Sequence, residues 1–383
     1  MWIIAAILLL MLLLPDAYIV WGVMKDYSWW WRGLFLLPTV AYIVVIILLF
    51  AKEGSRQAFF NWIFWLTLCV VFPVVIFTIF SLIGLGGGLI HPKIYTVFNW
   101  IALGIAGCWL FISLYGIGFG WRKVTVENLT LQFPHLPSSF RGYKIVQLSD
   151  LHIGTYDLAP GTVDRIVGKV NSLKPDLIVF TGDIVNSKPE ELNPYMEVLE
   201  KLKAPDGVIS ILGNHDYCFY RSYAGTDDSP EKAKTRVIEK ERAMGWEVLL
   251  NSSQEIVRGN DKIAIIGVEN SGGKNFINLS DLKKAMKGIN ENEFKILLSH
   301  DPSQWRREVL PESNIDLTLS GHTHAMQFKI GNFSPSEWAY KEWGGLYEEG
   351  NRKLHVNTGT GGNIAFRFGA YPQITVITLE PES

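Results

Sequence analysis

Cysteine is scarce in this chain, which holds 3 cysteines among its 383 residues. Cys69 and Cys108 lie in apolar segments, and only Cys218 lies in the polar part of the sequence. This number cannot supply the disulfide framework that stabilises small secreted domains. We therefore expect the protein to work in a reducing compartment.

An excess of charge of either sign is also missing, because the formal net charge is −2 at pH 7. The sequence therefore gives no indication of a nucleic-acid partner. Residues 1–24 are apolar but lack the basic start and the Ala-x-Ala site of a secretory signal. We therefore do not expect a signal peptide to be cleaved there.

Apolar residues are abundant: 48% of the chain is hydrophobic, and the mean hydropathy is +0.17. They are concentrated in four runs, which are residues 1–24, Leu34–Phe50, Phe59–Ile83 and Tyr95–Phe119. A helix of ~20 apolar residues crosses a hydrocarbon core of roughly 30 Å. Residues 1–120 are therefore predicted to form an all-α bundle of four transmembrane helices. The alternative is that one of the four is interfacial or re-entrant.

Two features interrupt the apolar runs. Asp16 follows Pro15 in the first run, and we expect its carboxylate near a bilayer face or against a neighbouring helix. The segment Gly84–Gly88 is rich in glycine and is predicted to be a flexible connector. It lacks the Lys-Ser/Thr pair that follows a phosphate-binding loop.

Basic residues in the short loops predict the topology. Lys52, Arg56, Arg122 and Lys123 lie on the side of the N-terminus, and Lys25, Arg32 and Lys93 lie on the opposite side. The small excess on the first side predicts a multi-pass protein of the cell (inner) membrane with both termini in the cytoplasm. The C-terminal domain is then cytoplasmic.

Residues 121–383 have the composition of a globular domain. Apolar strands alternate there with amphipathic helices, which predicts an α/β fold with buried sheets. The expected strands are Lys144–Leu148, Asp176–Phe180, Gly207–Leu212, Lys262–Gly267, Lys295–Leu298 and Ile315–Leu319. The expected helices are Thr162–Ser172, Pro194–Leu202, Ser229–Met244 and Leu279–Ile289. Val124–Val126 and Leu129–Leu131 are predicted to be a strand pair, and Lys353–Val356 and Gln373–Leu379 are predicted to complete a second sheet.

Five loops that follow predicted strands carry Asp, His or Asn. They are Asp150-Leu151-His152, Gly182-Asp183, Gly213-Asn214-His215-Asp216, Ser299-His300-Asp301 and Gly321-His322-Thr323-His324. Five of the 8 histidines of the chain fall in these loops. Because ligands bind at the carboxyl ends of strands in open α/β sheets, we expect the loops to meet in one crevice.

This set of side chains offers oxygen and nitrogen ligands but no thiolate. Such a set suits Mn, Fe, Zn or Ni better than a Cys-rich structural zinc site, and it holds more nitrogen than Mg or Ca prefers. There are too many ligands for one ion. Two divalent ions about 3.5–4 Å apart that share a carboxylate use them all.

The five motifs, in this order, resemble those of the calcineurin-like metallophosphoesterase family. The resemblance covers roughly Lys144 to Gly362, and the apolar segment before it is similar to the membrane-bound branch, which includes bacterial UDP-diacylglucosamine pyrophosphatases. It implies a four-layer αββα sandwich in residues 121–383 and a dinuclear metal centre. No ligand position of the family pattern is substituted.

The resemblance also implies a role for each residue of the motifs. The first metal ion is bound by Asp150, His152 and His324, and the second by Asn214, His300 and His322, with Asp183 bridging the two. His215 binds no metal but lies beside the phosphate, where it stabilises or protonates the leaving oxygen. Asp216 is expected to orient His215.

Aromatic segments near the motifs are candidates for substrate contacts. The segment Tyr217–Asp228 follows the third motif and holds several aromatic residues, beginning with Tyr217. We expect it to form a substrate wall in which Arg221 binds a second phosphate. The alternative is an ordinary surface loop. The segment Pro335–Gly350 carries several aromatic residues that suit either bilayer docking or packing under the site.

These observations predict a membrane-anchored phosphoester hydrolase in which a metal-bridging hydroxide attacks a phosphodiester or pyrophosphate. An anchored enzyme suits a lipid-linked substrate, so the expected partners are the lipid bilayer and that phosphoester. The alternatives are a phosphomonoesterase or nucleotide phosphodiesterase acting on a soluble substrate, a membrane sensor or transporter with a regulatory metal domain, and a non-catalytic scaffold.

Overall fold

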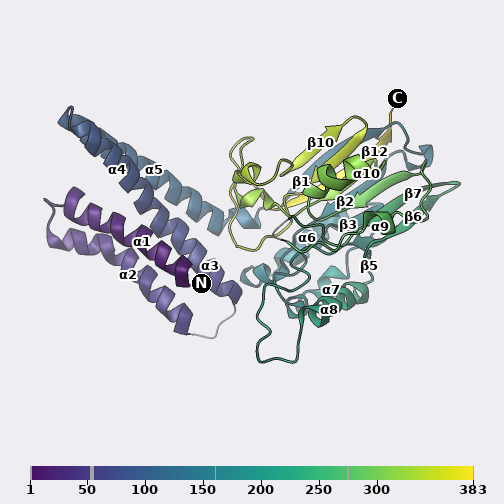
Figure 1. Ribbon diagram of the computed structural model, residues 1–383, viewed down its shortest axis with the longest axis horizontal. Helices are drawn as coiled ribbons and strands as arrows, with labels where there is room; N and C mark the ends of the chain where they lie inside the picture. The colour runs from purple at the N-terminus through teal and green to yellow at the C-terminus, as the bar shows by residue number, and fades with distance from the viewer. Residues whose placement is uncertain (1, 52–55, 160, 274–275, 383) are drawn as a thin grey trace. The chain divides into compact units, whose positions relative to one another are not determined.

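The computed structural model describes residues 2–51, 56–159, 161–273 and 276–382 (Figure 1). The chain divides into two compact units, Met1–Phe119 and Gly120–Ser383. The first unit is helical, and the second contains both sheets. Lys52, on which part of the predicted topology depends, lies outside the described residues.

The first unit consists of apolar helices. They are α1 (Trp2–Tyr18), α2 (Trp29–Ala51), α3 (Arg56–Leu66), α4 (Phe72–Gly88) and α5 (Pro92–Gly118), with π turns at Ile19–Val23 and Thr67–Val71. Within the described part of the chain, three segments are long and apolar enough to cross a membrane: Trp29–Leu48, Asn61–Gly88 and Pro92–Arg122. The apolar helix at Ile7–Val23 is shorter. Three of the four predicted crossings therefore meet this criterion.

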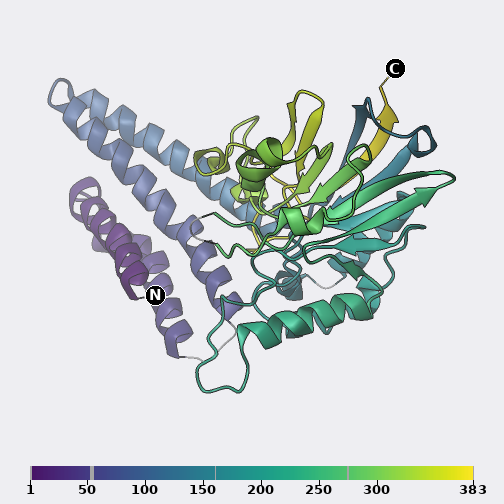
Figure 2. The ribbon, with the colours of Figure 1, turned by 45° about the vertical axis from the view of Figure 1, so that its right-hand side comes forward.

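The predicted flexible connector at Gly84–Gly88 is wrong, because these residues form the last turns of α4. A Cβ atom at Gly84 would collide with the side chain of Phe98, and one at Gly87 would collide with Ile94. Small residues let helix backbones approach closely in a membrane. The glycines therefore permit close packing of α4 against α5, which lie side by side in Figures 1 and 2.

Asp16 faces a neighbouring helix. Its carboxylate is buried and accepts a hydrogen bond of 2.5 Å from the hydroxyl of Thr39 on α2. On α4, Ser81 donates a hydrogen bond of 2.5 Å to Asn99 of α5. Buried polar pairs of this kind hold apolar helices together. Of the two positions expected for Asp16, the structure shows the one against another helix.

The second unit contains two six-stranded sheets. The first has the order β1-β12-β2-β3-β4-β5, with strands Thr125–Phe133, Gln373–Pro381, Tyr143–Leu148, Leu177–Phe180, Val208–Ser210 and Glu247–Val248. The second has the order β10-β11-β9-β8-β7-β6, with strands Gly345–Glu349, Arg352–Val356, Leu317–Ser320, Phe294–Leu298, Asp261–Gly267 and Ser252–Arg258. Both sheets are mixed: β2 to β5 run parallel, as do β11, β9, β8 and β7, and antiparallel strands complete each sheet.

The two sheets pack face to face. Alternate residues of β2, such as Ile145, join residues of β8, such as Ile296, in one buried core between the sheets. The outer face of the second sheet packs Leu297 against Trp305 of a helical segment. On the first sheet, Val248 of β5 packs against Ile238 of α8, which lies below β5 in Figure 1. Helices therefore cover both sheets, as expected for an α/β domain.

The helices of this unit are α6 (Thr162–Ser172), α7 (Met196–Leu199), α8 (Pro230–Ala243), α9 (Leu282–Ala285) and α10 (Leu310–Glu312). The helices α6 and α8 match the predicted ranges closely, whereas α7 and α9 are single turns. The predicted strand pair at Val124–Leu131 is wrong: β1 is one continuous strand that pairs in parallel with β12. The segment Gln373–Leu379 is a strand, as predicted, but it belongs to the first sheet and not to the second.

The parallel strands bring the five motifs to one edge of the sandwich. In the first sheet β2, β3 and β4 are neighbours, and each ends just before a motif that contains Asp150, Asp183 or Asn214. In the second sheet β8 and β9 are neighbours and end before His300 and His322. Parallel neighbours end at the same edge of a sheet, so the predicted convergence of the loops is confirmed.

Candidate metal centre

The candidate ligands lie in strained turns at the strand ends. The backbone angle φ is 51° at Asp150, 44° at His152, 60° at Asp183, 77° at His322 and 52° at His324. Residues with a Cβ atom rarely adopt this left-handed conformation, and strain of this kind concentrates at functional sites. These five are among 11 non-glycine residues with positive φ in the part of the chain that the structure describes. The fold therefore holds them in positions that the local backbone does not favour.

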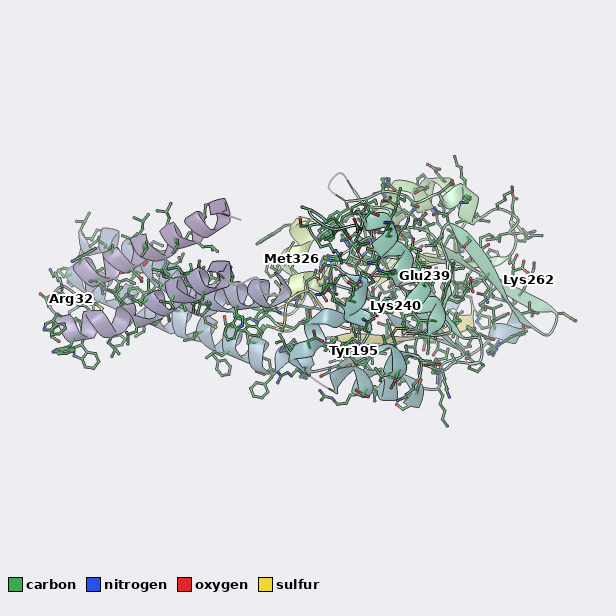
Figure 3. All side chains as sticks on the ribbon, turned by 90° about the horizontal axis from the view of Figure 1, so that it is seen from below. Arg32, Tyr195, Glu239, Lys240, Lys262 and Met326 are labelled. Carbon is green, nitrogen blue, oxygen red and sulfur yellow. The ribbon has the colours of Figure 1, made fainter. Side chains whose placement is uncertain are left out.

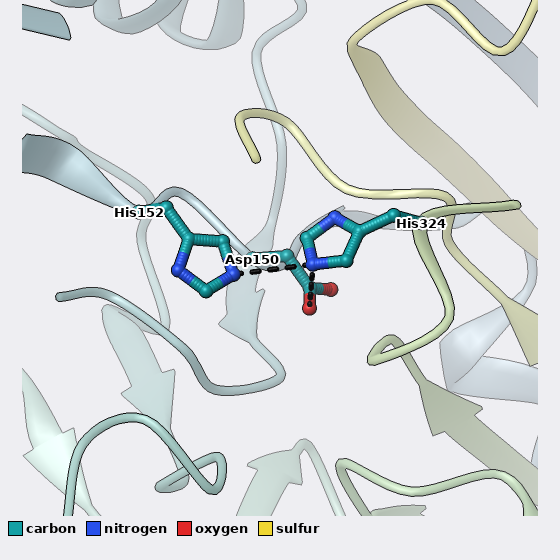
Figure 4. A group of neighbouring side chains, drawn as sticks. All are labelled: Asp150, His152 and His324. Atoms are coloured by element: carbon teal, nitrogen blue, oxygen red, sulfur yellow. Dashed lines mark hydrogen bonds and ion pairs between the residues drawn. The ribbon is translucent and has the colours of Figure 1, made fainter. Parts of the chain in front are cut away.

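One cluster of ligands joins Asp150, His152 and His324 (Figure 4). Their ligand atoms all lie within 4.8 Å of one another. Nε2 of His152 faces Nε2 of His324 at 3.1 Å, and the latter lies 3.4 Å from Oδ1 of Asp150. Two neutral imidazole nitrogens and a carboxylate that point at one place form a typical site for a divalent transition metal.

A second cluster joins Asp183, His300 and His322, again with all ligand atoms within 4.8 Å. Nδ1 of His322 lies 3.3 Å from Nε2 of His300. Oδ2 of Asp183 is 3.2 Å from Nε2 of His300 and 3.6 Å from Nε2 of His152 in the first cluster. One carboxylate therefore lies between the two clusters, where a ligand shared by two ions is required.

Asn214 lines the same cavity as Asp183 and His322 of the second cluster. Its Oδ1 atom is buried and has no hydrogen-bond partner among the residues that the structure describes. Its Nδ2 donates a hydrogen bond of 2.9 Å to the hydroxyl of Tyr220, which fixes the orientation of the amide. A buried acceptor without a partner is costly. A metal ion in the second cluster would satisfy this oxygen, so the residues present fit the predicted dinuclear centre.

Outer contacts orient two of the imidazoles. Nδ1 of His300 lies 2.7 Å from the carbonyl oxygen of Thr181, so this nitrogen carries the proton and Nε2 is left for a ligand. Nε2 of His322 lies 2.7 Å from the hydroxyl of Tyr340, and its Nδ1 faces the cluster. Such contacts fix the tautomer and the ring direction of metal-binding histidines.

Burial keeps three of the imidazoles neutral. It lowers the pKa of His152 to about 3, with a further contribution from His215. It also lowers the pKa of His322 to about 4 and that of His324 well below its usual range. Neutral imidazoles retain the lone pair that a metal requires.

His300 differs from the other three. Burial disfavours its charge, but the adjacent carboxylate of Asp183 raises the pKa of His300 to about 10. In the first cluster, burial raises the pKa of Asp150 to about 6. Without metal, His300 therefore carries a second proton, on the Nε2 atom that faces Asp183. A metal ion that binds there displaces this proton.

Two glycines of the motifs leave room for the carboxylates. A Cβ atom on Gly321 would collide with Asp150 Oδ2, and one on Gly213 would collide with Asp183 Oδ1. Neither residue has positive φ. Glycine is therefore required at these positions by close approach, and not by a left-handed turn.

His215 lies at the mouth of the site. Its backbone N–H donates a hydrogen bond of 2.8 Å to Asp183, and its Nδ1 lies 2.6 Å from the carbonyl oxygen of Asn186. Its Nε2 lies 3.2 Å from Nδ2 of Asn363. His215 and Asn363 both line a cavity of about 200 Å³ that also contains Asp183 and His324. The ring therefore borders the space that a phosphate would occupy.

The orienting role predicted for Asp216 is wrong, because its carboxylate does not contact the ring of His215. It accepts four backbone hydrogen bonds of 2.7–3.1 Å, from the N–H groups of Asp183, Ile184, Val185 and Gly213. Burial raises the pKa of Asp216 to about 7, with a further contribution from Asp183. Asp216 joins the second and third motif loops and does not reach the reacting atoms.

Arg221 and Tyr217, for which substrate contacts were predicted, have partners within the chain. Arg221 pairs with Asp228 at 2.8 Å and with Glu190 at 3.4 Å, so its charge is already neutralised. Tyr217 is buried, and its hydroxyl lies 3.2 Å from a carboxylate oxygen of Glu269. Neither residue lines the cavity at the metal clusters.

Other aromatic and apolar residues lie beside the metal site. The ring of Tyr220 lies 4.4 Å from that of His215, while Phe276, Met326 and Tyr340 line the cavity. Tyr220 and Tyr340 both lie in the aromatic segments that the sequence singled out. Asn363 directly follows a glycine-rich stretch at residues 359–362, a local pattern that could have pointed to it. Phe276 carried no signal, because it reaches the site only through tertiary packing.

The comparisons with known proteins agree with this geometry. The sequence profile described as "Calcineurin-like phosphoesterase" matches residues 143–326. The chain is 30% identical over 281 residues to the "Uncharacterized metallophosphoesterase YkuE" of Bacillus subtilis, an alignment that covers 69% of this chain and 91% of that protein. It is 29% identical over 280 residues to a "Transmembrane protein with metallophosphoesterase domain" of Danio rerio, covering 70% of this chain and 60% of that protein.

A third relative has a named activity. The chain is 28% identical over 294 residues to the "UDP-2,3-diacylglucosamine pyrophosphatase LpxG" of Chlamydia muridarum, which covers 65% of this chain and 86% of that protein. The match of the family profile spans all the motif loops that follow β2, β3, β4, β8 and β9. This chain therefore belongs to the calcineurin-like phosphoesterase family and is a metal-dependent phosphoesterase.

Proposed function

We propose that this chain is a membrane-anchored dimetal hydrolase that cleaves a phosphodiester or pyrophosphate bond of a lipid-linked substrate. The observation that carries the proposal is the position of Asp183. Its Oδ2 lies 3.6 Å from His152 in one ligand cluster and 3.2 Å from His300 in the other. A carboxylate in this place serves two ions at once, as dinuclear hydrolytic sites require.

The proposed ligand sets follow from the two clusters. Asp150, His152 and His324 hold one ion, and His300, His322 and Asn214 hold the other, with Asp183 between them. The ions are divalent transition metals such as Mn, Fe, Zn or Ni, since the set mixes imidazole with oxygen ligands.

The bound metals supply a hydroxide near neutral pH and offset the charge of the phosphate. The chain's own residues position the substrate and handle the proton. His215 borders the cavity and is held by Asn186 through Nδ1, so its Nε2 is directed toward Asn363 and the cavity. From this position His215 donates a proton to the leaving oxygen, with Asn363 as a second polar contact.

Two observations support a lipid-linked substrate. The first unit contains three segments able to cross a membrane among the residues described. A similar protein from Chlamydia muridarum is named as a pyrophosphatase of a diacylated UDP-sugar. An enzyme held at a bilayer meets lipid-linked substrates at a high effective concentration. We place the second unit in the cytoplasm, with the shorter apolar helix at Ile7–Val23 as the fourth crossing.

Hydrolysis by the full-length protein in detergent tests the activity. With Mn²⁺ it should cleave an aryl phosphodiester, and Asp183→Asn should lose most of its turnover and metal content. Asp164→Asn, on the exposed face of α6, is the matched control and should retain both. If the metal-loaded protein cleaves neither phosphomonoesters nor phosphodiesters, the proposed activity is wrong.

A separate comparison tests the substrate class. The same protein is given a lipid-linked pyrophosphate in mixed micelles and, in parallel, a soluble nucleotide diester. A higher kcat/KM for the lipid-linked compound supports the proposal. A preference for the soluble nucleotide would leave the hydrolase intact and contradict the lipid-linked substrate. Protection of the second unit from protease added outside sealed inverted vesicles would contradict its cytoplasmic location.

A further inference from the structure

Apolar side chains project from the loop that follows the fifth motif. Met326, Ile330, Phe333 and Trp338 are 49%, 54%, 39% and 78% exposed. They fall within 13 residues, directly after the candidate ligand His324. Elsewhere in the described part of the second unit, exposed large apolar residues form one neighbouring pair, Phe219 and Tyr220, or occur singly. The single ones are Leu158, Val257, Leu279 and Leu346. A group of four in one loop is therefore a local feature that calls for a partner.

The loop that carries them is internally braced. The hydroxyl of Ser334 donates a hydrogen bond of 2.7 Å to the carbonyl of Ala325, and Lys329 N–H donates one of 2.8 Å to Phe368. The rings of Phe333 and Trp338 meet edge to face with centroids 5.8 Å apart. The exposure is thus maintained by fixed backbone contacts and ring packing.

A second loop adds apolar side chains close to the metal site. Phe219 and Tyr220 are 48% and 47% exposed, and Tyr220 packs against the ring of His215. Met326 of the first loop lines the same cavity as His215. We call the six residues Phe219, Tyr220, Met326, Ile330, Phe333 and Trp338 the apolar rim. Through Tyr220 and Met326, both loops of the rim reach the metal cavity.

We propose that the apolar rim inserts into the surface of the lipid bilayer, so that the metal site opens at the membrane–water interface. Chain continuity supports this partner: α5 ends at Gly118, and the second unit begins at Gly120. Gly120, where the second unit begins, packs against the backbone of Arg367, and the guanidinium of Arg367 lies 3.4 Å from Nδ1 of His324, so the chain enters the second unit close to the metal site. Tryptophan and phenylalanine are side chains that anchor proteins at this depth. The same segment contains Lys329 and Lys341, which suit the lipid phosphates above the buried rings.

The inference rests on the membrane anchoring in the proposed function, but not on hydrolysis. It implies that a lipid-linked phosphate reaches the metals without leaving the bilayer surface, while its acyl chains remain among the lipids. The headgroup of such a lipid would have to move away from the bilayer only by the depth to which the rim is inserted. This deepens the proposed substrate class by assigning a route of entry.

Fluorescence quenching from within the bilayer tests the insertion in the full-length protein. The variant Trp338→Cys is labelled with an environment-sensitive fluorophore and reconstituted in phosphatidylcholine vesicles that contain nitroxide-labelled lipid. Cys69→Ala and Cys108→Ala remove the other accessible thiols, and Cys218 is buried. The expected result is a loss of fluorescence at position 338, together with protection from iodide in the water.

Val257 supplies the matched control position. It is an exposed apolar residue of β6, paired with Lys262 of β7. Lys262 and Met326 lie at opposite ends of the second unit in Figure 3. A fluorophore at Val257→Cys should be quenched by iodide and unaffected by the nitroxide lipid. Phe333→Cys repeats the test in the first loop, and thermal unfolding shows that each labelled variant is folded.

Two results would overturn the inference. Quenching by iodide alone at both 333 and 338 would show that the rim lies in water. Protection from both quenchers, with a dimer seen by cross-linking, would show that a second copy of the chain covers the rim. Neither result depends on turnover, so a failure of the inference is distinct from a failure of the proposed hydrolase.

Discussion

The hydroxyl of Tyr340 lies 2.7 Å from Nε2 of His322, on the side of the ring opposite to the metal cluster. The other ring nitrogen, Nδ1, faces His300 at 3.3 Å. This contact fixes which nitrogen of His322 is offered to a metal and in which direction. Tyr340 lies two residues after Trp338 of the apolar rim, so this loop of the rim also supports the second cluster.

Removal of this hydroxyl should weaken the metal site. For Tyr340→Phe we expect metal affinity or turnover to fall by roughly 10–100-fold, the usual cost of losing an outer contact to a histidine ligand. Metal titration and steady-state kinetics measure this. Tyr195→Phe is the control, because its hydroxyl donates to Asp157 away from the site (Figure 3). Equal effects in the two variants would argue that Tyr340 has no special role.

Loss of the imidazole at position 215 should reduce turnover without removing the metals. A positioned acid contributes roughly 10²–10⁴-fold, so we expect kcat of His215→Gln to fall by that factor. The loss should be smaller for substrates with good leaving groups, which need no proton. Elemental analysis should find unchanged metal content. His135→Gln, at an exposed position, is the control, and loss of metal from His215→Gln would instead make His215 a ligand.

Metal binding near neutral pH should release a proton. The carboxylate of Asp183 raises the pKa of His300 to about 10 in the metal-free site, so this imidazole is charged below that pH. A metal requires the neutral ring, so about one proton leaves as it binds, and apparent affinity rises with pH. Calorimetry in two buffers of different ionisation enthalpy measures the number. A binding enthalpy that is independent of buffer would contradict the prediction.

A buried carboxylate on α8 should make stability depend on pH. Burial raises the pKa of Glu241 well above its ordinary value of 4.5, and Asp216 adds to this. The folded protein therefore holds a proton that the unfolded chain has lost. The resulting stabilisation is complete below about pH 4.5 and is lost as pH rises through the folded-state pKa.

The variant Glu241→Gln has no proton to lose, so the decline of its Tm with rising pH should be shallower than that of the parent. The amide can still accept the hydrogen bond that Ser210 donates to Glu241. Glu239→Gln, exposed on the same helix (Figure 3), should keep the parent's slope. An unchanged slope in Glu241→Gln would mean that other groups cause the pH dependence.

Much of the site could be predicted from the sequence because its information is local. Each motif directly follows a buried parallel strand, so Asp150, Asp183 and His322 are placed by strand ends alone. The role of Asp216 could not be predicted, because it depends on backbone N–H groups from another loop. The ion pairs of Arg221 with Glu190 and Asp228 could not be predicted for a similar reason, because these residues meet only in the folded chain.

The fold was predictable where the apolar period is clear, as in β2 and α6. It was not predictable where tertiary partners override the local signal. The glycines of Gly84–Gly88 favour a loop in isolation, but packing against α5 keeps them helical. Likewise, the interrupted apolar pattern of Thr125–Phe133 suggests two short strands, but pairing with β12 along its whole length makes it one.

Each ligand cluster draws on both sheets. Asp150 and His152 follow β2 in the first sheet, whereas His324 follows β9 in the second. In the other cluster, Asp183 follows β3 in the first sheet and His300 follows β8 in the second. A bound ion would therefore link the two sheets at the edge where their motif loops meet. The metal-free protein should keep its sandwich, because the apolar core between the sheets remains, but it lacks this link and should unfold more readily. A cell short of metal would then hold a population of this protein that is both idle and more easily degraded.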